Sequence, residues 1–254
     1  MSTINPYVPP SGSSVRSPPA VSAQPGSALD FGRALRFFFQ DPNWVQKLII
    51  GSLFTIFSMF LIGGVFIAGY AARLVRRTAR GEPYPLPEWD DLGGMFVEGL
   101  SVIGAYLIHL VPAVVGAGVV LLPMVFLGAR DSDPSPAVLF VLIPLILLAT
   151  LVFFAVLLYF PAAFTRLAVE ERFGAALELD ANWAFVKRNM SNYFLAIAAF
   201  FVANFLAQFG ILLFCIGILP ATFWSQCVGA YALGEVALRD RGRVGQGPLK
   251  AASR

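Results

Sequence analysis

Residues 137–160 read AVLFVLIPLILLATLVFFAVLLYF, a run that is almost entirely apolar and contains no charged side chain. A helix needs about 20 apolar residues to cross the hydrocarbon core of a bilayer, so this run is long enough to span one. Inside lipid, every backbone polar group has to be satisfied within the protein, which an α-helix achieves. The stretch therefore predicts a transmembrane helix.

The composition of the whole chain agrees with a membrane protein. Of its 254 residues, 57% are hydrophobic and only 13% are charged, and the mean hydropathy is +0.73. In a soluble domain, about a quarter of the residues are charged. The chain has too little polar surface to cover itself in water, so lipid has to cover the rest. We expect an all-α integral membrane protein.

Four more apolar segments reach the length of a span. They are residues 48–72, 95–126, 193–213 and 216–236. We expect four full transmembrane helices plus an N-terminal short helical hairpin, or a fifth span, at residues 48–72. Together they form a helical membrane domain over residues 29–238. The Pro- and Ser-rich residues 1–28 and the basic residues 239–254 are predicted to be disordered tails.

Basic residues mark one side of the membrane. An arginine cluster follows the first segment, a charged stretch over residues 166–188 separates the third from the fourth, and more arginines follow the fifth. The positive-inside rule places all three in the cytoplasm. The acidic loop with Asp131 and Asp133 then falls outside. The expected location is the cytoplasmic (inner) membrane, multi-pass, with a cytoplasmic C-terminus.

Residues 48–72 allow two interpretations, because basic residues flank them at both ends. In a hairpin, residues 48–60 enter the bilayer and residues 62–72 return, with the turn at Gly63 and Gly64. Each arm of about 12 residues reaches about 18 Å, which is less than a full crossing. In the alternative, the segment is one straight span with the N-terminal tail outside. The hairpin is the favoured interpretation.

An internal repeat supports the hairpin. The pentapeptide FGRAL that begins at Phe31 resembles FGAAL that begins at Phe173, and each precedes a tryptophan-containing stretch and an apolar segment. The two units run over residues 31–81 and 173–242, and each ends on a glycine, Gly242 in the second. Duplication of this kind is common in membrane proteins. The second unit contains a hairpin of two spans, so we interpret the first unit as a shorter version of that hairpin.

Several motifs resemble one known family. They are FQDPNW at residues 39–44, RGE at residues 80–82, LPEWDD at residues 86–91 and FVEG at residues 96–99. The pattern is similar to the prokaryotic membrane family catalogued as domain of unknown function 4013, over nearly the whole chain except its two tails. The resemblance implies a multi-span membrane protein of uncharacterised role. It supplies no catalytic residues.

The loop before the second segment carries candidate binding residues. Trp89 suits the membrane–water boundary, and Asp90 or Asp91 is placed to cap the following helix. In this structural interpretation the carboxylates pair with arginines such as Arg73. The other interpretation is a binding loop for a protein partner or a lipid headgroup.

Two stretches are predicted to be amphipathic helices on the membrane surface. Residues 177–190 place apolar side chains at helical spacing, at Leu179, Trp183, Val186 and Met190. In residues 35–44, the consecutive Phe37, Phe38 and Phe39 are expected to dip into lipid. Such helices serve either interfacial packing or curvature sensing and partner docking.

A few polar side chains lie inside the apolar segments. His109 is ionisable and is therefore a candidate functional residue, or else a hydrogen-bonded packing residue. Asn204 and Gln208 are four residues apart and share a helix face, and Gln226 lies in the fifth segment. These amides act either as hydrogen-bonding glue between helices or as the lining of a polar path.

The sequence contains no recognisable catalytic constellation. A single histidine leaves little scope for acid–base chemistry or metal binding, and there is no nucleophile elbow, phosphate loop or paired intramembrane aspartate. We expect no enzyme, cofactor or metal. Cys215 and Cys227 lie in apolar sequence and are expected to be small buried hydrophobes. A basic soluble domain for nucleic acid is also missing.

Two functions fit these observations. The first is a non-enzymatic membrane scaffold, assembly factor or bilayer-shaping factor. The alternative is a small permease or transporter component with a polar path between the second, fourth and fifth segments, past His109, Asn204, Gln208 and Gln226. The expected partners are the lipid bilayer and either another protein or further copies of the chain.

Overall fold

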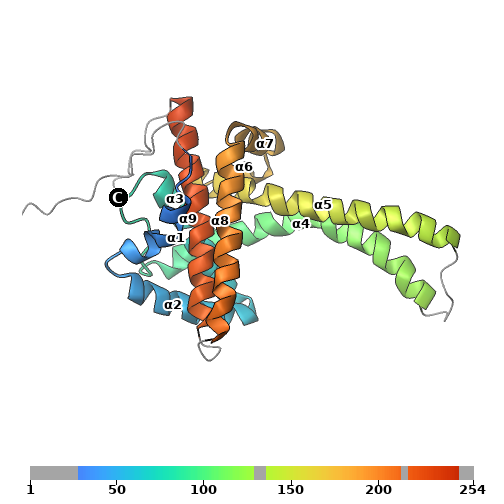
Figure 1. The fold of residues 1–254 in the computed structure, drawn as a ribbon, viewed down its shortest axis with the longest axis horizontal. Helices are drawn as coiled ribbons and strands as arrows, with labels where there is room; N and C mark the ends of the chain where they lie inside the picture. The colour runs from blue at the N-terminus through green and yellow to red at the C-terminus, as the bar shows by residue number, and fades with distance from the viewer. Residues whose placement is uncertain (1–27, 129–135, 213–216, 246–254) are drawn as a thin grey trace, which may run out of the picture.

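The computed structural model describes residues 28–128, 136–212 and 217–245. Every regular element within these ranges is helical, so the all-α expectation is confirmed (Figure 1). In chain order the elements are α1 (Phe31–Arg36), η1 (Phe37–Gln40), α2 (Trp44–Phe57), η2 (Ser58–Phe60), α3 (Ile62–Ala79), α4 (Leu92–Gly128), α5 (Pro136–Glu170), α6 (Phe173–Leu177), α7 (Leu179–Arg188), α8 (Met190–Gln208), η3 (Phe209–Leu212) and α9 (Ile218–Val244).

Three helices in the described ranges are long and apolar enough to cross a bilayer. They are Leu92–Phe126 in α4, Val138–Glu170 in α5 and Met190–Leu212, which joins α8 to η3. A shorter apolar helix, Trp44–Phe60, comprises α2 and η2. The expected fifth span, α9, falls outside this group, since polar residues such as Gln226 and Glu235 interrupt it. Length and composition thus support a membrane protein.

Helix α9 occupies the centre of the helical body. It packs against α8, α3 and α2, and residues 227–237 are all buried. Small residues let the neighbouring helices come close. A Cβ at Gly234, for example, would lie 2.7 Å from the backbone oxygen of Val75 in α3. This helix is therefore covered by protein and not left to lipid.

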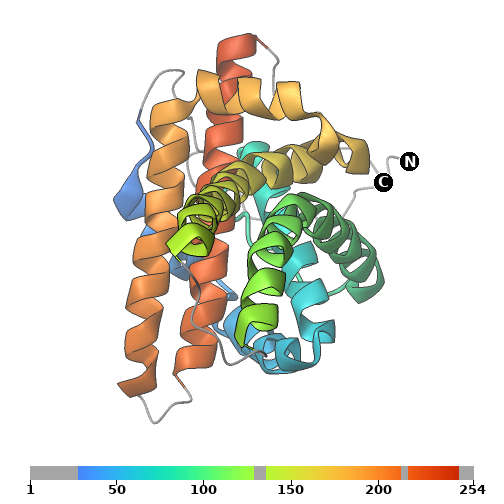
Figure 2. The same ribbon diagram turned by 90° about the vertical axis from the view of Figure 1, so that its right-hand side faces the viewer.

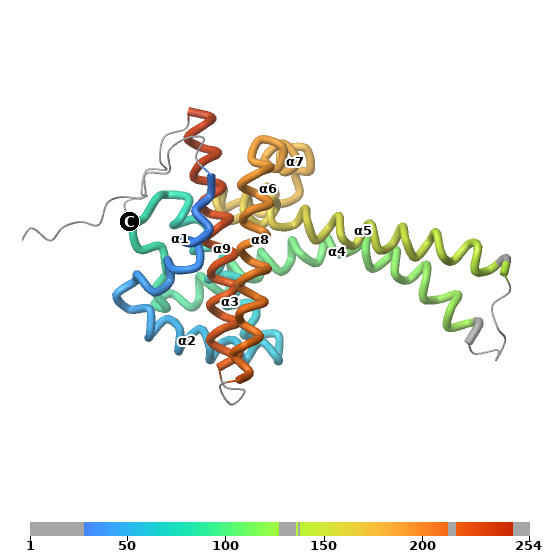
Figure 3. Tube along the Cα trace, in the orientation of Figure 1, coloured from blue at the N-terminus to red at the C-terminus, as the bar shows by residue number. Residues whose placement is uncertain are grey.

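Helices α4 and α5 form an arm that projects from this body. Figure 3 traces the chain outward through α4 and back through α5. Figures 1 and 2 show that the arm runs across the direction of α8 and α9. Only 11% of the most apolar stretch of α4, and 6% of that of α5, is buried. The arm therefore exposes apolar side chains over most of its length, which suits lipid better than water.

The first apolar segment is a broken helix that turns back on itself. Helix α2 ends at Phe57, η2 follows, and Leu61 takes a φ of 64° before α3 begins. The rings of Phe54 and Phe66 lie 4.7 Å apart across the turn. Helices α2 and α3 therefore form a hairpin, as the favoured interpretation of this segment expects.

The position of that turn was predicted wrongly. It lies at residues 58–61, whereas Gly63 and Gly64 are inside α3. Gly63 is needed for another reason: a Cβ there would come within 2.1 Å of the backbone oxygen of Phe54. The glycine allows the two arms of the hairpin to approach, while the positive φ falls on Leu61.

A second pair of glycines joins α3 to α4. A Cβ at Gly69 would lie 1.9 Å from the backbone oxygen of Met95, and a Cβ at Gly99 would lie 1.8 Å from that of Val65. Each glycine thus makes room for the backbone of the opposite helix. This contact fixes where the arm leaves the body.

The two amphipathic stretches behave differently. In α7, Leu179 and Trp183 are exposed as expected, but Val186 is buried. In η1, the prediction that all three phenylalanines enter lipid was wrong for Phe37 and Phe38, which are buried. Phe37 stacks on Tyr231 of α9 at 4.0 Å between ring centroids.

The helical structure at the C-terminal end extends beyond the expected residue 238. Helix α9 continues to Val244, and Arg239, assigned above to a disordered tail, is buried within it. Both repeated pentapeptides form short helices, α1 and α6. The glycine that ends α9 with a φ of 73° is Gly245, whereas Gly242 lies inside the helix. The predicted N-terminal tail lies outside the described residues, apart from Ala28.

Candidate functional site: the charged end of the helix bundle

The charged side chains gather at one end of the bundle. This charged end comprises the C-terminal turns of α3, α5 and α9, the N-terminal turns of α4 and α8, and helix α7. Ion pairs connect these elements, for example Arg76 to Glu98 at 2.8 Å between α3 and α4, and Arg188 to Asp240 at 3.0 Å between α7 and α9. Helix ends that lie far apart in the sequence are thereby tied together.

Helix α3 contributes four arginines on one face. Arg73, Arg76, Arg77 and Arg80 follow helical spacing, so they line up along the helix. All four are in ion pairs, with Glu98, Asp91, Glu82 and Glu171 among their partners. Their positive charge is largely neutralised by these carboxylates.

Asp91 is the residue that caps α4. Its Oδ1 accepts a hydrogen bond from the Gly94 backbone N–H at 2.9 Å, and its Oδ2 accepts one from Arg73 at 2.7 Å. The Gly94 N–H and then the Arg73 guanidinium hold the pKa of the Asp91 carboxyl below its usual range. The structural interpretation of this loop, a capped helix start paired with Arg73, agrees with the geometry. Asp90 is exposed beside it.

Trp89, in the loop before α4, packs against other side chains of the protein. Its indole stacks on Tyr70 at 4.5 Å and on Phe54 at 4.9 Å between ring centroids, so it closes an aromatic cluster over α2 and α3. Next to this cluster, Lys47 is buried and pairs with Asp41 at 2.9 Å. Nothing in the local sequence indicates that this lysine is internal.

A buried charge cluster around Glu235 was also missed. The carboxylate accepts hydrogen bonds from Tyr231 Oη at 3.0 Å and from Arg33 Nη2 at 3.1 Å, and it pairs with Arg239 one helical turn later. Glu235 is 1% exposed and Arg239 is 2% exposed. The four-residue spacing of Glu235 and Arg239 was visible in the sequence, but their burial was not.

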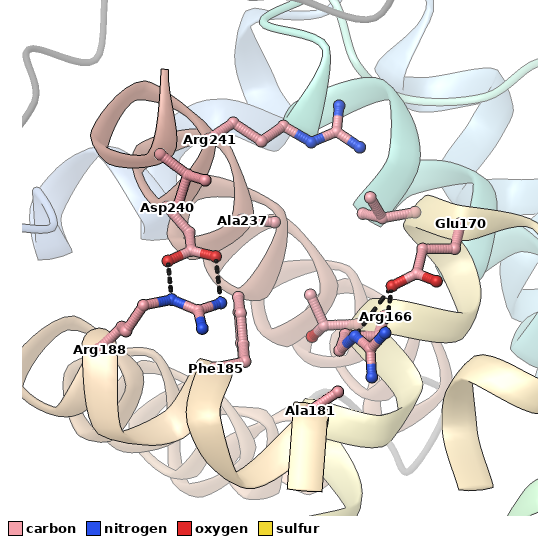
Figure 4. A pocket seen from close by; sticks show the side chains of 11 residues that line it. Arg166, Glu170, Ala181, Phe185, Arg188, Ala237, Asp240 and Arg241 are labelled. Atoms are coloured by element: carbon pink, nitrogen blue, oxygen red, sulfur yellow. Dashed lines mark hydrogen bonds and ion pairs between the residues drawn. The ribbon is translucent and has the colours of Figure 1, made fainter. Parts of the chain in front are cut away.

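A polar pocket of about 400 Å³ opens at the charged end, between α5, α7 and α9 (Figure 4). Two ion pairs stand on its walls: Arg166 with Glu170, and Arg188 with Asp240. Arg188 is bidentate, donating from Nε at 3.1 Å and from Nη2 at 3.0 Å. The pocket thus combines guanidinium groups from two walls.

Arg241 is the third guanidinium of this pocket. Its Nη1 is buried and has no hydrogen-bond partner among the described residues. Burial, and then the positive charge of Arg80, lower the pKa of Arg241. Guanidinium groups that are not neutralised in a pocket favour a planar or tetrahedral oxyanion. The arrangement can therefore bind an anion.

The polar residues expected inside the membrane are not brought together. His109 Nδ1 lies 2.8 Å from the backbone oxygen of Ala105 in the same helix, and the His109 ring contacts Tyr159 of α5. The side-chain amide of Asn204 donates a hydrogen bond to Phe200 O at 3.0 Å, and that of Gln208 donates one to Asn204 O at 3.5 Å. Both hydrogen bonds therefore stay within α8.

Gln226 and Cys227 are neighbours in α9. Gln226 lines an apolar crevice between the arm and α9. Cys227 is buried, as expected, whereas Cys215 lies outside the described residues.

In the described parts of the chain, the fold is all helical, several helices are long and apolar enough to span a membrane, and ion pairs gather at the charged end. The chain belongs to the family described as Protein of unknown function (DUF4013), whose model matches residues 43–216, more than half of the chain. No curated protein and no solved structure matches it.

Proposed function

We propose that the protein is a non-enzymatic scaffold of the cytoplasmic membrane that shapes the bilayer around it. In this proposal, the α2–α3 hairpin, the arm and the α8–α9 pair all enter the membrane from the cytoplasm. The charged end, both chain termini and the basic loops stay on the cytoplasmic side, in agreement with the positive-inside rule.

The observation that carries the proposal is the apolar tip of the α2–α3 hairpin. Met59 is 85% exposed, Phe60 71% and Leu61 82%. Helices of 14 and 18 residues are about 21 and 27 Å long, which is shorter than the hydrocarbon core of about 30 Å. An uncharged tip of this kind is stable in lipid and not in water. The hairpin therefore dips into the bilayer without crossing it and displaces lipid unequally between the leaflets.

The length of the arm adds to this argument. Helices α4 and α5 have 37 and 35 residues, or about 55 and 53 Å. A span of such length has to tilt strongly, lie along the membrane or deform it. Because the arm runs across the direction of α8 and α9 (Figure 2), the two pairs cannot both follow the normal of a flat bilayer.

The permease alternative has less support. Of its four expected path residues, Gln226 lines the apolar crevice, while the amides of Asn204 and Gln208 bond to their own helix. His109 packs against α5. A path for a polar solute needs these groups around one shared space.

Cysteine labelling tests the placement in the membrane. Single cysteines at Ser14, Met59 and Ser253, in a chain lacking Cys215 and Cys227, are treated with a membrane-impermeant thiol reagent. We expect Ser14→Cys and Ser253→Cys to react only after cell lysis. Met59→Cys should resist labelling before and after lysis, because its side chain lies in lipid. Labelling of Met59→Cys in intact cells would mean that the tip crosses the membrane.

Reconstitution into liposomes tests the shaping activity. We expect the mean vesicle diameter, measured by electron cryomicroscopy, to fall as the protein-to-lipid ratio rises. A Met59→Glu, Phe60→Glu variant should lose most of this effect, because two charges draw the tip out of the bilayer. Tyr84→Glu, on an exposed residue of the loop before α4, is the matched control. A vesicle diameter that is independent of wild-type protein content would refute the proposal.

A further inference from the structure

Two hollows lie along one face of α9. An apolar crevice of about 390 Å³ is bounded by α3, α4, α5, α8 and α9, and the polar pocket described above follows it. Residues of α9 line both in steps of three and four, which keeps them on one face of the helix: Gln226, Ala230 and Leu233 in the crevice, then Ala237, Arg241 and Val244 in the pocket.

Helix α5 repeats this order. Phe160 and Phe164 line the crevice, while Thr165 and Arg166 line the pocket. Along both helices, an apolar hollow among the membrane-facing segments is thus followed by a polar one at the charged end. This is the order of parts in a phospholipid, whose acyl chains adjoin an anionic headgroup.

The charges of the pocket favour an anion. Its lining contains the guanidinium groups of Arg166, Arg188 and Arg241 against the carboxylates of Glu170 and Asp240. The first two arginines are paired with these carboxylates, so Arg241 supplies the excess positive charge. In Figure 4 the Arg241 side chain extends over the pocket from α9, away from the Arg188–Asp240 pair.

The arginine face of α3 is a weaker candidate for the same role. A groove of about 350 Å³ runs along Arg73, Arg76, Arg77 and Arg80. All four guanidinium groups there already have carboxylate partners. An incoming anion would have to displace those carboxylates, whereas Arg241 has no carboxylate partner in the part of the chain that the structure describes.

We propose that the pocket binds the phosphate of an anionic phospholipid through Arg241, with an acyl chain of the same lipid in the apolar crevice. The inference rests on the membrane location given under the proposed function, but not on bilayer shaping. Arg188 and Thr165 stand on the pocket walls, where they can add hydrogen bonds to the phosphate oxygens.

Binding of short-chain lipids to the purified full-length protein in mild detergent tests the proposal. The probes are dioctanoyl phosphatidic acid, dihexanoyl phosphatidic acid, dioctanoyl phosphatidylcholine, dioctanoylglycerol and inorganic phosphate, followed by titration calorimetry. We expect dioctanoyl phosphatidic acid to bind most tightly and its dihexanoyl analogue more weakly, since a longer chain buries more apolar surface. Dioctanoylglycerol, which lacks the phosphate, should not bind at the site.

Arg241→Gln is the variant that decides the role of the pocket. It should weaken binding of dioctanoyl phosphatidic acid roughly ten-fold or more, because a charged hydrogen-bond donor to phosphate is lost. Its melting temperature without lipid should match the wild type, since Arg241 Nη1 is unpaired and Arg241 forms no ion pair within the described residues. Arg36→Gln is the matched control, because Arg36 is exposed on α1 and donates to Gly32 O of its own helix.

Three results would overturn the proposal. One is equal binding of phosphatidic acid by the wild type and by Arg241→Gln. Another is binding of inorganic phosphate as tight as that of the lipid, which would assign the pocket to a soluble anion. The third is equal affinity for phosphatidylcholine and phosphatidic acid. Each can occur with normal vesicle shaping, so failure here is distinguishable from failure of the scaffold proposal.

Discussion

Replacement of Glu235 by glutamine is the sharpest test of what holds the bundle together. The change removes one negative charge and keeps the size of the side chain. Its partner Arg239 would then stay charged at 2% exposure with no carboxylate beside it. Arg33, the other basic partner, is partly exposed and can recover hydration.

The cost follows from the burial of the pair. Removing one member of a buried ion pair typically costs about 3–5 kcal/mol, because the remaining charge is left uncompensated. For a protein of this size, 1 kcal/mol corresponds to roughly 2–4 °C in melting temperature. We therefore expect Glu235→Gln to melt about 6–20 °C below the wild type in detergent.

Glu171→Gln is the matched control for this measurement. Glu171 also pairs with arginines, but it is 51% exposed, and exposed pairs contribute about 0–1 kcal/mol. A double change, Glu235→Leu with Arg239→Leu, should lose less stability than Glu235→Gln, because no charge remains buried. The reasoning fails if Glu235→Gln and Glu171→Gln have the same melting temperature, or if the double variant is the least stable of the three.

Two further outcomes are expected. Gly69→Ala in α3 should destabilise the protein by about 1–3 kcal/mol in detergent melts, because the added methyl meets the Met95 backbone oxygen. Gly118→Ala in α4, where a Cβ meets open space, should be tolerated. Similar melting of both variants would contradict the close α3–α4 contact. The pKa of Asp91 is lower in the folded protein than the usual carboxyl value of 3.8, so Asp91 stabilises the fold above that value and loses this contribution as the pH falls through the lowered pKa. Asp91→Ala should therefore have a lower melting temperature than the wild type at neutral pH, and its melting temperature should fall less on acidification. If the melting temperatures of the variant and the wild type fall by the same amount on acidification, the cap is excluded.

Several features could be predicted from the sequence because they depend on local chemistry. The apolar run at residues 137–160 forms part of α5, and the basic flanks of residues 48–72 led to the hairpin that α2 and α3 form. Asp91 caps α4 because a carboxylate just before a helix meets free backbone N–H groups whatever the tertiary fold.

Other features depended on neighbours that are distant in the chain. The turn was expected at Gly63, yet Leu61 carries the positive φ and Gly63 accommodates the Phe54 backbone. Arg241 was expected in a flexible tail, but the pocket it enters is completed by α5 and α7. Spacing along one helix does not indicate which other helix will face it.

The sequence by itself indicated an apolar, all-helical chain, the position of its long apolar helices and which helix ends carry charge. Only the tertiary structure decided which apolar residues are buried against protein and which remain exposed. Phe38 is buried while Phe39 is exposed, and α9 is enclosed while the arm is bare. The physical reason is that lipid tails and a packed protein interior are equally apolar, so hydropathy cannot distinguish one from the other.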